Sequence, residues 1–126
     1  MQSKRGTLSN LLKTPGGAAK YDSHLERDYM IELDHDPRVA QWTREHGIRI
    51  PYRFWGIPRH YLPDFLVTFK NSSQELHETK GLPLLFWNST KAKRRAAEAY
   101  SAERGWKYVI ITTDWKKRTE VMRNRK

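Results

Sequence analysis

The sequence predicts an α/β domain in which helices flank a central mixed sheet. Three observations lead to this prediction. Apolar residues recur with helical spacing in residues 23–34 and 90–104, and the runs between these segments alternate like strands. Residues 108–112 are a continuous apolar run, as expected of a strand buried on both faces. A strand, the second helix and this last strand in succession form a parallel crossover unit.

Size and composition narrow the class of protein. The chain has 126 residues, close to the usual size of one domain, and a formal net charge of +10. This charge favours a polyanionic partner, most often a nucleic acid, although a ribosomal or membrane-surface role fits the charge alone. The absence of cysteine excludes disulfides and thiolate metal sites. No apolar run is long enough to span a membrane and the N-terminus lacks a signal-peptide core, so we expect a cytoplasmic protein.

The first segment of the chain has no clear period. Residues 1–20 are basic and contain Pro15-Gly16-Gly17, which interrupts any helix, so we predict a flexible N-terminal arm. The helix at residues 23–34 begins with Ser23 as its N-cap and Glu26 three residues later, which together form a capping box. The helix ends before Pro37, because the residue preceding a proline avoids the α region.

Short strands follow the first helix. We predict them at residues 39–42, 48–55, 59–61, 65–69 and 75–80. The second of these alternates between an apolar face and a basic face, and Gly56 marks the turn of a hairpin. Pro63 stands at the start of the next strand, where a missing N–H is tolerated.

The second helix, at residues 90–104, takes Ser89 or Thr90 as its N-cap and ends at Gly105. Cations crowd its first turns, where they oppose the helix dipole unless a phosphate binds there. We therefore predict DNA contacts there, with a solvated basic face as the alternative. The four cations are Lys91, Lys93, Arg94 and Arg95. A second candidate DNA-binding surface carries Arg49, Arg53 and Arg59, interleaved with aromatic residues.

Three charged residues form the chemical centre of the sequence. Asp64 follows Pro63, and after a gap of thirteen residues come Glu78 and Lys80, two positions apart on one face of a strand. Two carboxylates can hold a hard divalent cation, and an ammonium can position a water or a phosphate oxygen beside it. Asp64 stands between apolar neighbours, where an unpaired buried charge costs several kcal/mol. The alternatives are a turn acid and a surface ion pair worth at most about 1 kcal/mol.

The order of these motifs resembles the PD-(D/E)xK nuclease superfamily, and most of all the TnsA-type transposon endonucleases. The resemblance spans about residues 21–113. The matching motifs are Ser23 to Glu26, Asp36-Pro37-Arg38-Val39, Tyr52 to Trp55, Tyr61 to Val67, Glu78 to Lys80, and Lys91. The resemblance implies a restriction-endonuclease-like core with a central mixed sheet of four to five strands flanked by helices.

The resemblance also implies an activity, which is Mg²⁺-dependent cleavage of double-stranded DNA with Mn²⁺ as a substitute. Glu26, Asp64 and Glu78 would be the metal ligands, and Lys80 would orient the attacking water. TnsA-type proteins cut the 5′ ends of a transposon together with a DDE-type transposase, which is the partner expected here. Residues 21–113 would be the nuclease domain, and residues 114–126 a basic C-terminal helix or tail.

Two alternatives stay open. A Holliday-junction resolvase or restriction-type enzyme has the same core and would act as a homodimer. A non-catalytic DNA-binding module would keep the fold without the metal. His77 and Thr79 lie on the strand face opposite Glu78, so His77 is either functional, exposed, or hydrogen-bonded beneath the first helix.

Overall fold

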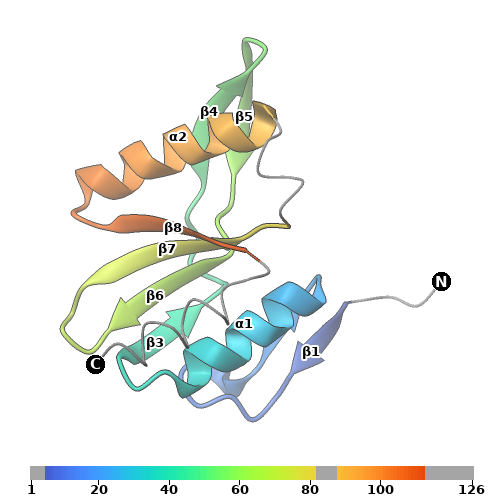
Figure 1. Ribbon diagram of the computed structural model, residues 1–126, viewed down its shortest axis with the longest axis vertical. Helices are drawn as coiled ribbons and strands as arrows, with labels where there is room; N and C mark the ends of the chain where they lie inside the picture. Colours follow the sequence, from blue (N-terminus) through green and yellow to red (C-terminus); the bar gives the residue numbers. More distant parts are fainter. Residues whose placement is uncertain (1–4, 82–87, 113–126) are drawn as a thin grey trace.

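The computed structural model describes residues 5–81 and 88–112. Four strands form the central sheet, and two further strand pairs lie beside it (Figure 1). The elements are β1 Gly6–Leu8, the 3-10 turn η1 Pro15–Gly17, β2 Ala19–Tyr21, α1 His24–His35, β3 Val39–Thr43, β4 Ile50–Phe54, β5 Ile57–Tyr61, β6 Phe65–Phe69, β7 Gln74–Thr79, α2 Asn88–Glu103 and β8 Lys107–Ile111.

The central sheet has the strand order β3-β6-β7-β8. Its first three strands pair antiparallel, whereas β7 and β8 pair parallel across α2. The sheet lies between α1 and α2, which cover opposite faces (Figure 1). This arrangement confirms the predicted α/β class, the mixed sheet and the crossover unit, and it is consistent with a restriction-endonuclease-like fold.

Alternate residues of a strand point to opposite faces of the sheet, and each face of this sheet carries a hydrophobic cluster. Phe65 and Val67 of β6 face α1, where they pack with Tyr29, Met30 and other buried side chains. Leu76 of β7 faces the opposite way and packs with residues of α2 and of the β4–β5 hairpin. Each helix therefore buries its own apolar stripe against one face of the same sheet.

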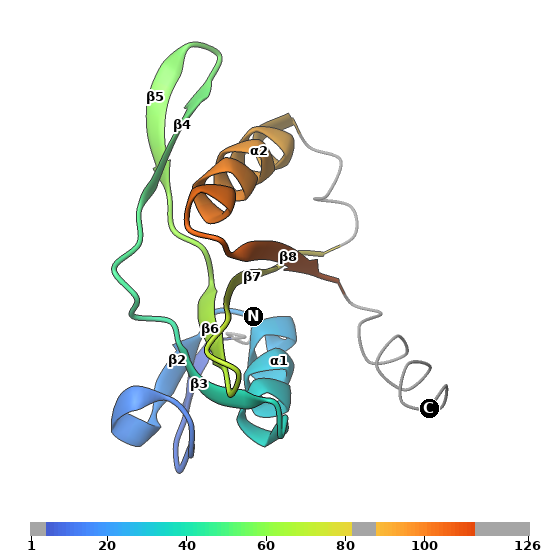
Figure 2. The same ribbon diagram turned by 90° about the vertical axis from the view of Figure 1, so that its left-hand side faces the viewer.

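Strands β4 and β5 form the hairpin that the alternating basic and apolar pattern predicts. They are a separate two-stranded sheet, and Ile50 and Tyr61 at its base are buried against Ala97 of α2. The hairpin extends past α2, away from the central sheet (Figure 2). Its base is therefore part of the core, while its tip projects from the domain.

The N-terminal segment is not the flexible arm that we predicted, as far as residues 5–20 are concerned. Strands β1 and β2 pair antiparallel, and Leu8 and Leu11 pack against the α1 cluster. The buried carboxylate of Asp34 accepts hydrogen bonds from the backbone N–H groups of Leu12 and Lys13, at 2.9 Å each for the shorter contacts. Periodicity could not reveal this packing, because it depends on backbone donors far from Asp34 in sequence.

Three smaller expectations need correction or lie outside the described residues. Strand β8 is half-buried, not buried on both faces, because it is the edge strand of the described sheet. Helix α2 already includes Ser89 and Thr90, the two predicted N-caps. The predicted helix or tail at 114–126 lies outside the described residues. Neither described helix is long and apolar enough to cross a membrane.

Candidate active site

Asp64 and Glu78 are neighbours across two paired strands. Phe65 of β6 lies opposite His77 of β7, so the residue before Phe65 faces the residue after His77. The backbone N–H of Asp64 donates to Glu78 Oε1 at 3.1 Å. Asp64 Oδ2 accepts from both the backbone N–H and the hydroxyl of Thr79, at 2.8 Å each. The thirteen-residue gap is therefore the length of one antiparallel hairpin that brings the two acids together.

The electrostatics of this carboxylate pair are unfavourable without a cation. Glu78 is buried, with 6% of its surface exposed. Burial and the nearby charge of Asp64 raise the pKa of Glu78 to about 9, although a hydrogen bond with Tyr61 and the charge of Lys80 oppose the shift. At neutral pH the side chain therefore holds a proton when no cation is present. A divalent ion would remove that penalty by compensating both carboxylates.

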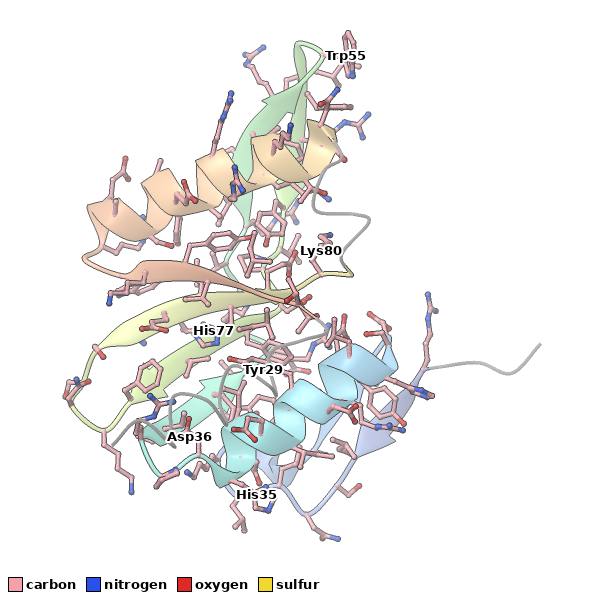
Figure 3. The ribbon with its side chains drawn as sticks, in the orientation of Figure 1. Tyr29, His35, Asp36, Trp55, His77 and Lys80 are labelled. Carbon is pink, nitrogen blue, oxygen red and sulfur yellow. The ribbon has the colours of Figure 1, made fainter. Side chains whose placement is uncertain are left out.

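Lys80 follows directly after β7. Its backbone N–H donates to the carbonyl of Ile111 at 2.9 Å, which fixes the chain at the end of β8. Figure 3 shows its side chain at the end of β7, on the α2 side of the sheet. Because its charge lowers the pKa of Glu78, the ammonium lies in the field of the carboxylate pair. The structure thus brings Asp64 and Glu78 into contact and places Lys80 directly after the strand that carries Glu78.

Glu26 reaches the pair only through an arginine that the sequence analysis missed. Arg44 Nη1 makes an ion pair with Glu26 Oε1, and Nη2 lies 4.0 Å from Asp64 Oδ1. The guanidinium also lies 5.4 Å from the centroid of the Phe65 ring and 3.9 Å from a carboxylate oxygen of Asp22. Arg44 is therefore a resident countercation between the predicted metal ligands of α1 and β6.

The capping box also uses Glu26, as its spacing predicts. The hydroxyl of Ser23 accepts from the backbone N–H of Glu26 at 3.1 Å. Glu26 Oε1 in turn accepts from the backbone N–H of Asp22 at 2.8 Å, one residue before the N-cap. The cap fixes the carboxylate at the N-terminal end of α1, facing Arg44 and the sheet.

The donor set fits a hard divalent cation. Within residues 5–81 and 88–112, no three His, Cys, Asp or Glu residues come together closely enough to hold a metal ion. Mg²⁺ does not need three, because it is commonly bound by one or two carboxylates plus water and substrate phosphates. Asp64 and Glu78 provide such a pair, and Glu26 could join them only if Arg44 moved aside.

His77 belongs to a different cluster on the opposite face of the sheet. The hydroxyl of Tyr29 contacts His77 Nδ1, and His77 Nε2 lies 2.8 Å from Glu75 Oε1 (Figure 3). The hydrogen bond from His77 lowers the pKa of Glu75. A carboxylate only accepts, so Nε2 carries the proton and Nδ1 accepts from the Tyr29 hydroxyl. His77 is therefore hydrogen-bonded beneath the first helix, one of the three positions considered for it.

A cavity of about 840 Å³ also lies on this side of the sheet, and Tyr29, Glu75 and His77 are among its lining residues. Neither Asp64 nor Glu78 lines it. This cavity and the carboxylate pair are thus separate features, and the chemistry of the two acids, not the cavity, identifies the candidate site.

The predicted DNA-binding cations lie on two neighbouring elements. Arg49, Arg53 and Arg59 are exposed on the β4–β5 hairpin and the segment leading to it. On α2, Lys91, Arg94 and Arg95 are exposed, and Lys93 is half-buried with Nζ 5.8 Å from the centroid of the Tyr61 ring. Helix α2 packs against β4, so both sets belong to the same side of the domain.

The comparison with known families covers the part of the chain that contains the carboxylate pair. A model of the TnsA-like endonuclease N-terminal domain matches residues 36–113, more than half of the chain. The chain belongs to this family. The matched TnsA-like segment contains Asp64, Glu78 and Lys80 and begins after Glu26. No curated protein matches the sequence. Membership in the TnsA-like family indicates a nuclease.

Proposed function

We propose that the protein is a Mg²⁺-dependent endonuclease that hydrolyses phosphodiester bonds of double-stranded DNA. The observation that carries this proposal is the Asp64–Glu78 pair, in which burial and mutual repulsion leave Glu78 with a pKa of about 9. A cost of this kind is typical of functional carboxylates, since stability alone does not favour a buried acid beside a partly buried one. Membership in the TnsA-like endonuclease family supports the same activity.

The residues divide the chemistry among them. Asp64 and Glu78 hold the cation, Mg²⁺ or Mn²⁺, and Glu26 completes the site once Arg44 has moved away. The bound ion supplies Lewis-acid stabilisation and a more acidic water. Lys80 donates hydrogen bonds that orient the attacking water or a phosphate oxygen. The exposed cations of the hairpin and of α2 hold the DNA backbone, which requires no base-specific contact.

Cleavage of plasmid DNA in the presence of Mg²⁺ or Mn²⁺ tests the proposal. We expect Asp64→Asn and Lys80→Met each to slow cleavage by about a hundredfold or more, because each removes a group that acts at the reacting centre. Lys107→Met is the matched control, since Lys107 is an exposed lysine on the neighbouring strand. Cleavage that survives in both site variants contradicts the assignment.

The proposed function also includes a protein partner. We propose that the protein works with a DDE-type transposase and cuts the 5′ ends of a transposon, in line with its family. Cleavage should then require the transposase and a transposon end, and the Asp64→Asn variant should abolish only the 5′ cuts. Junction-selective cutting by a homodimer, without a transposase, would support a resolvase in its place.

A further inference from the structure

The tip of the β4–β5 hairpin has an unusual residue for its geometry. Phe54 pairs with Ile57, so Trp55 and Gly56 alone form the turn. Both have positive φ, at 55° for Trp55 and 74° for Gly56, as in the two-residue turns that favour Asn-Gly. A bulky side chain at positive φ is strained, and such strain persists mainly where a function requires it.

Burial does not explain the tryptophan. Its side chain is 80% exposed, and Ile57 beside it is 53% exposed. The described contact of the Trp55 ring is with its neighbour Phe54, edge to face at 5.8 Å between centroids. Figure 3 shows Trp55 at the outer end of the hairpin, away from the core. An asparagine would suit this turn better, so the tryptophan indicates a contact outside the chain.

The charge around the tip identifies the class of partner. The segment from Ile48 to Pro63 contains three arginines and neither aspartate nor glutamate. Arg53 Nη1 donates to the carbonyl of Gly56 at 3.2 Å, which holds one guanidinium at the turn itself. Arginines around an exposed aromatic ring suit a nucleic acid, because the cations bind phosphates while the ring stacks on a base.

The hairpin connects this tip to the carboxylate pair. Strand β5 ends at the buried Tyr61, and Asp64 follows three residues later. Trp55 lies six positions before Tyr61 in the chain. The four extended steps from Ile57 to Tyr61 cover about 13 Å at about 3.3 Å each, and the turn adds a few ångströms, so the tip lies roughly five base pairs beyond the end of β5.

We propose that the β4–β5 tip is a DNA contact roughly five base pairs from the bond that is cut. Trp55 inserts at a base step of the duplex and stacks on the base that this exposes, while Arg53 and Arg59 bind the flanking phosphates. The inference rests on the proposed function, because it takes DNA as the substrate. It adds a stacking contact that the backbone-binding cations do not require.

Trp55→Asn tests the proposal, because the same substitution should maintain or raise the stability of the fold and lower the affinity for DNA. The variant should unfold at the same temperature as the wild type or higher, since asparagine tolerates positive φ. Its affinity for a 30-base-pair duplex in metal-free buffer should fall about tenfold or more, as expected for the loss of one stacked base. The slope of log Kd against log salt should not change, because no phosphate contact is lost. Trp55→Phe should retain most of the affinity.

Leu12→Asn is the matched control, because Leu12 is 83% exposed but lies on the N-terminal segment. It should leave the affinity unchanged. Hydroxyl-radical footprints of the wild type should show a protected stretch of DNA on one side of the cut. This protected stretch should be shorter in Trp55→Asn. Wild-type affinity and footprint in Trp55→Asn would overturn this inference and leave the nuclease proposal standing. Loss of binding to a protein partner alone would also overturn it. A wild-type protein that neither binds nor cuts DNA would refute both proposals.

Discussion

Replacing Glu78 by glutamine should make the metal-free protein more stable. Glutamine has nearly the same shape as a protonated glutamate but carries no charge at any pH. In the wild type, the raised pKa means that the folded state keeps a proton which the unfolded state releases above its ordinary pKa of 4.5. Between pH 4.5 and about 9 the unfolded state binds fewer protons, so the wild-type free energy of unfolding falls as pH rises.

The magnitude follows from the size of the shift. Each pH unit between the unfolded and folded pKa values costs about 1.4 kcal/mol. From 4.5 to pH 7 the wild type therefore loses about 3 kcal/mol that Glu78→Gln does not lose. For a domain of this size that difference raises the melting temperature by roughly 10 °C. Well below pH 4.5 the two proteins should be equally stable, because glutamate is then protonated in both the folded and the unfolded state.

Urea unfolding in EDTA at several pH values between 4.5 and 9 measures the effect. Glu75→Gln is the matched control, because Glu75 lies on the same strand but its pKa is lowered by the hydrogen bond from His77. That variant should be less stable than the wild type at neutral pH. Added Mg²⁺ should stabilise the wild type and have little effect on Glu78→Gln. The reasoning fails if Glu78→Gln is no more stable at pH 7, or if its advantage does not change with pH.

Three further changes have expected outcomes. Arg44→Met should lower the stability of the metal-free protein by about 2 kcal/mol, because Glu26 loses its charged partner. Calorimetric titration should show tighter Mg²⁺ binding in this variant, and unchanged affinity would mean that Arg44 does not compete with the ion. Asp34→Asn should cost about 2–4 kcal/mol and expose the N-terminal segment to proteases, because Asp34 accepts several buried hydrogen bonds; an intact digestion pattern would contradict this. Ser101→Ala should stabilise by about 1 kcal/mol in urea unfolding, since the buried Ser101 hydroxyl has no described partner. A loss of stability would reveal a missing contact.

Much of the fold could be predicted because the responsible signals are local. Helix α1 follows from its capping box and apolar spacing, and β6 and β7 follow from alternation and a short turn. The Asp64–Glu78 pair could be predicted for the same reason, since a hairpin register fixes which residues face each other. Lys80 follows from its two-residue distance to Glu78.

The remaining parts of the site depend on contacts between distant segments. Arg44 stands in the loop after β3 and carries no motif, yet its side chain reaches both α1 and β6. The position of His77 beneath α1 depends on Tyr29, 48 residues earlier. Local periodicity contains no information on such pairs. The sequence shows only that residue 44 is a cation. Its place beside the predicted acids appears only in the folded structure.

The bonds of Asp34 have a consequence for where this domain can be cut. The carboxylate joins the N-terminal segment to α1, and it also accepts from the indole N–H of Trp42 in β3 at 3.1 Å. A chain shortened to begin at residue 21 would keep the buried acid but lose the two backbone donors of Leu12 and Lys13. Helix α1, which carries Glu26, would then contain a buried carboxylate that keeps the indole N–H of Trp42 but has lost its backbone donors. The segment from Gly6 onward thus stabilises helix α1. A fusion or truncation that is meant to keep the fold must leave this segment intact.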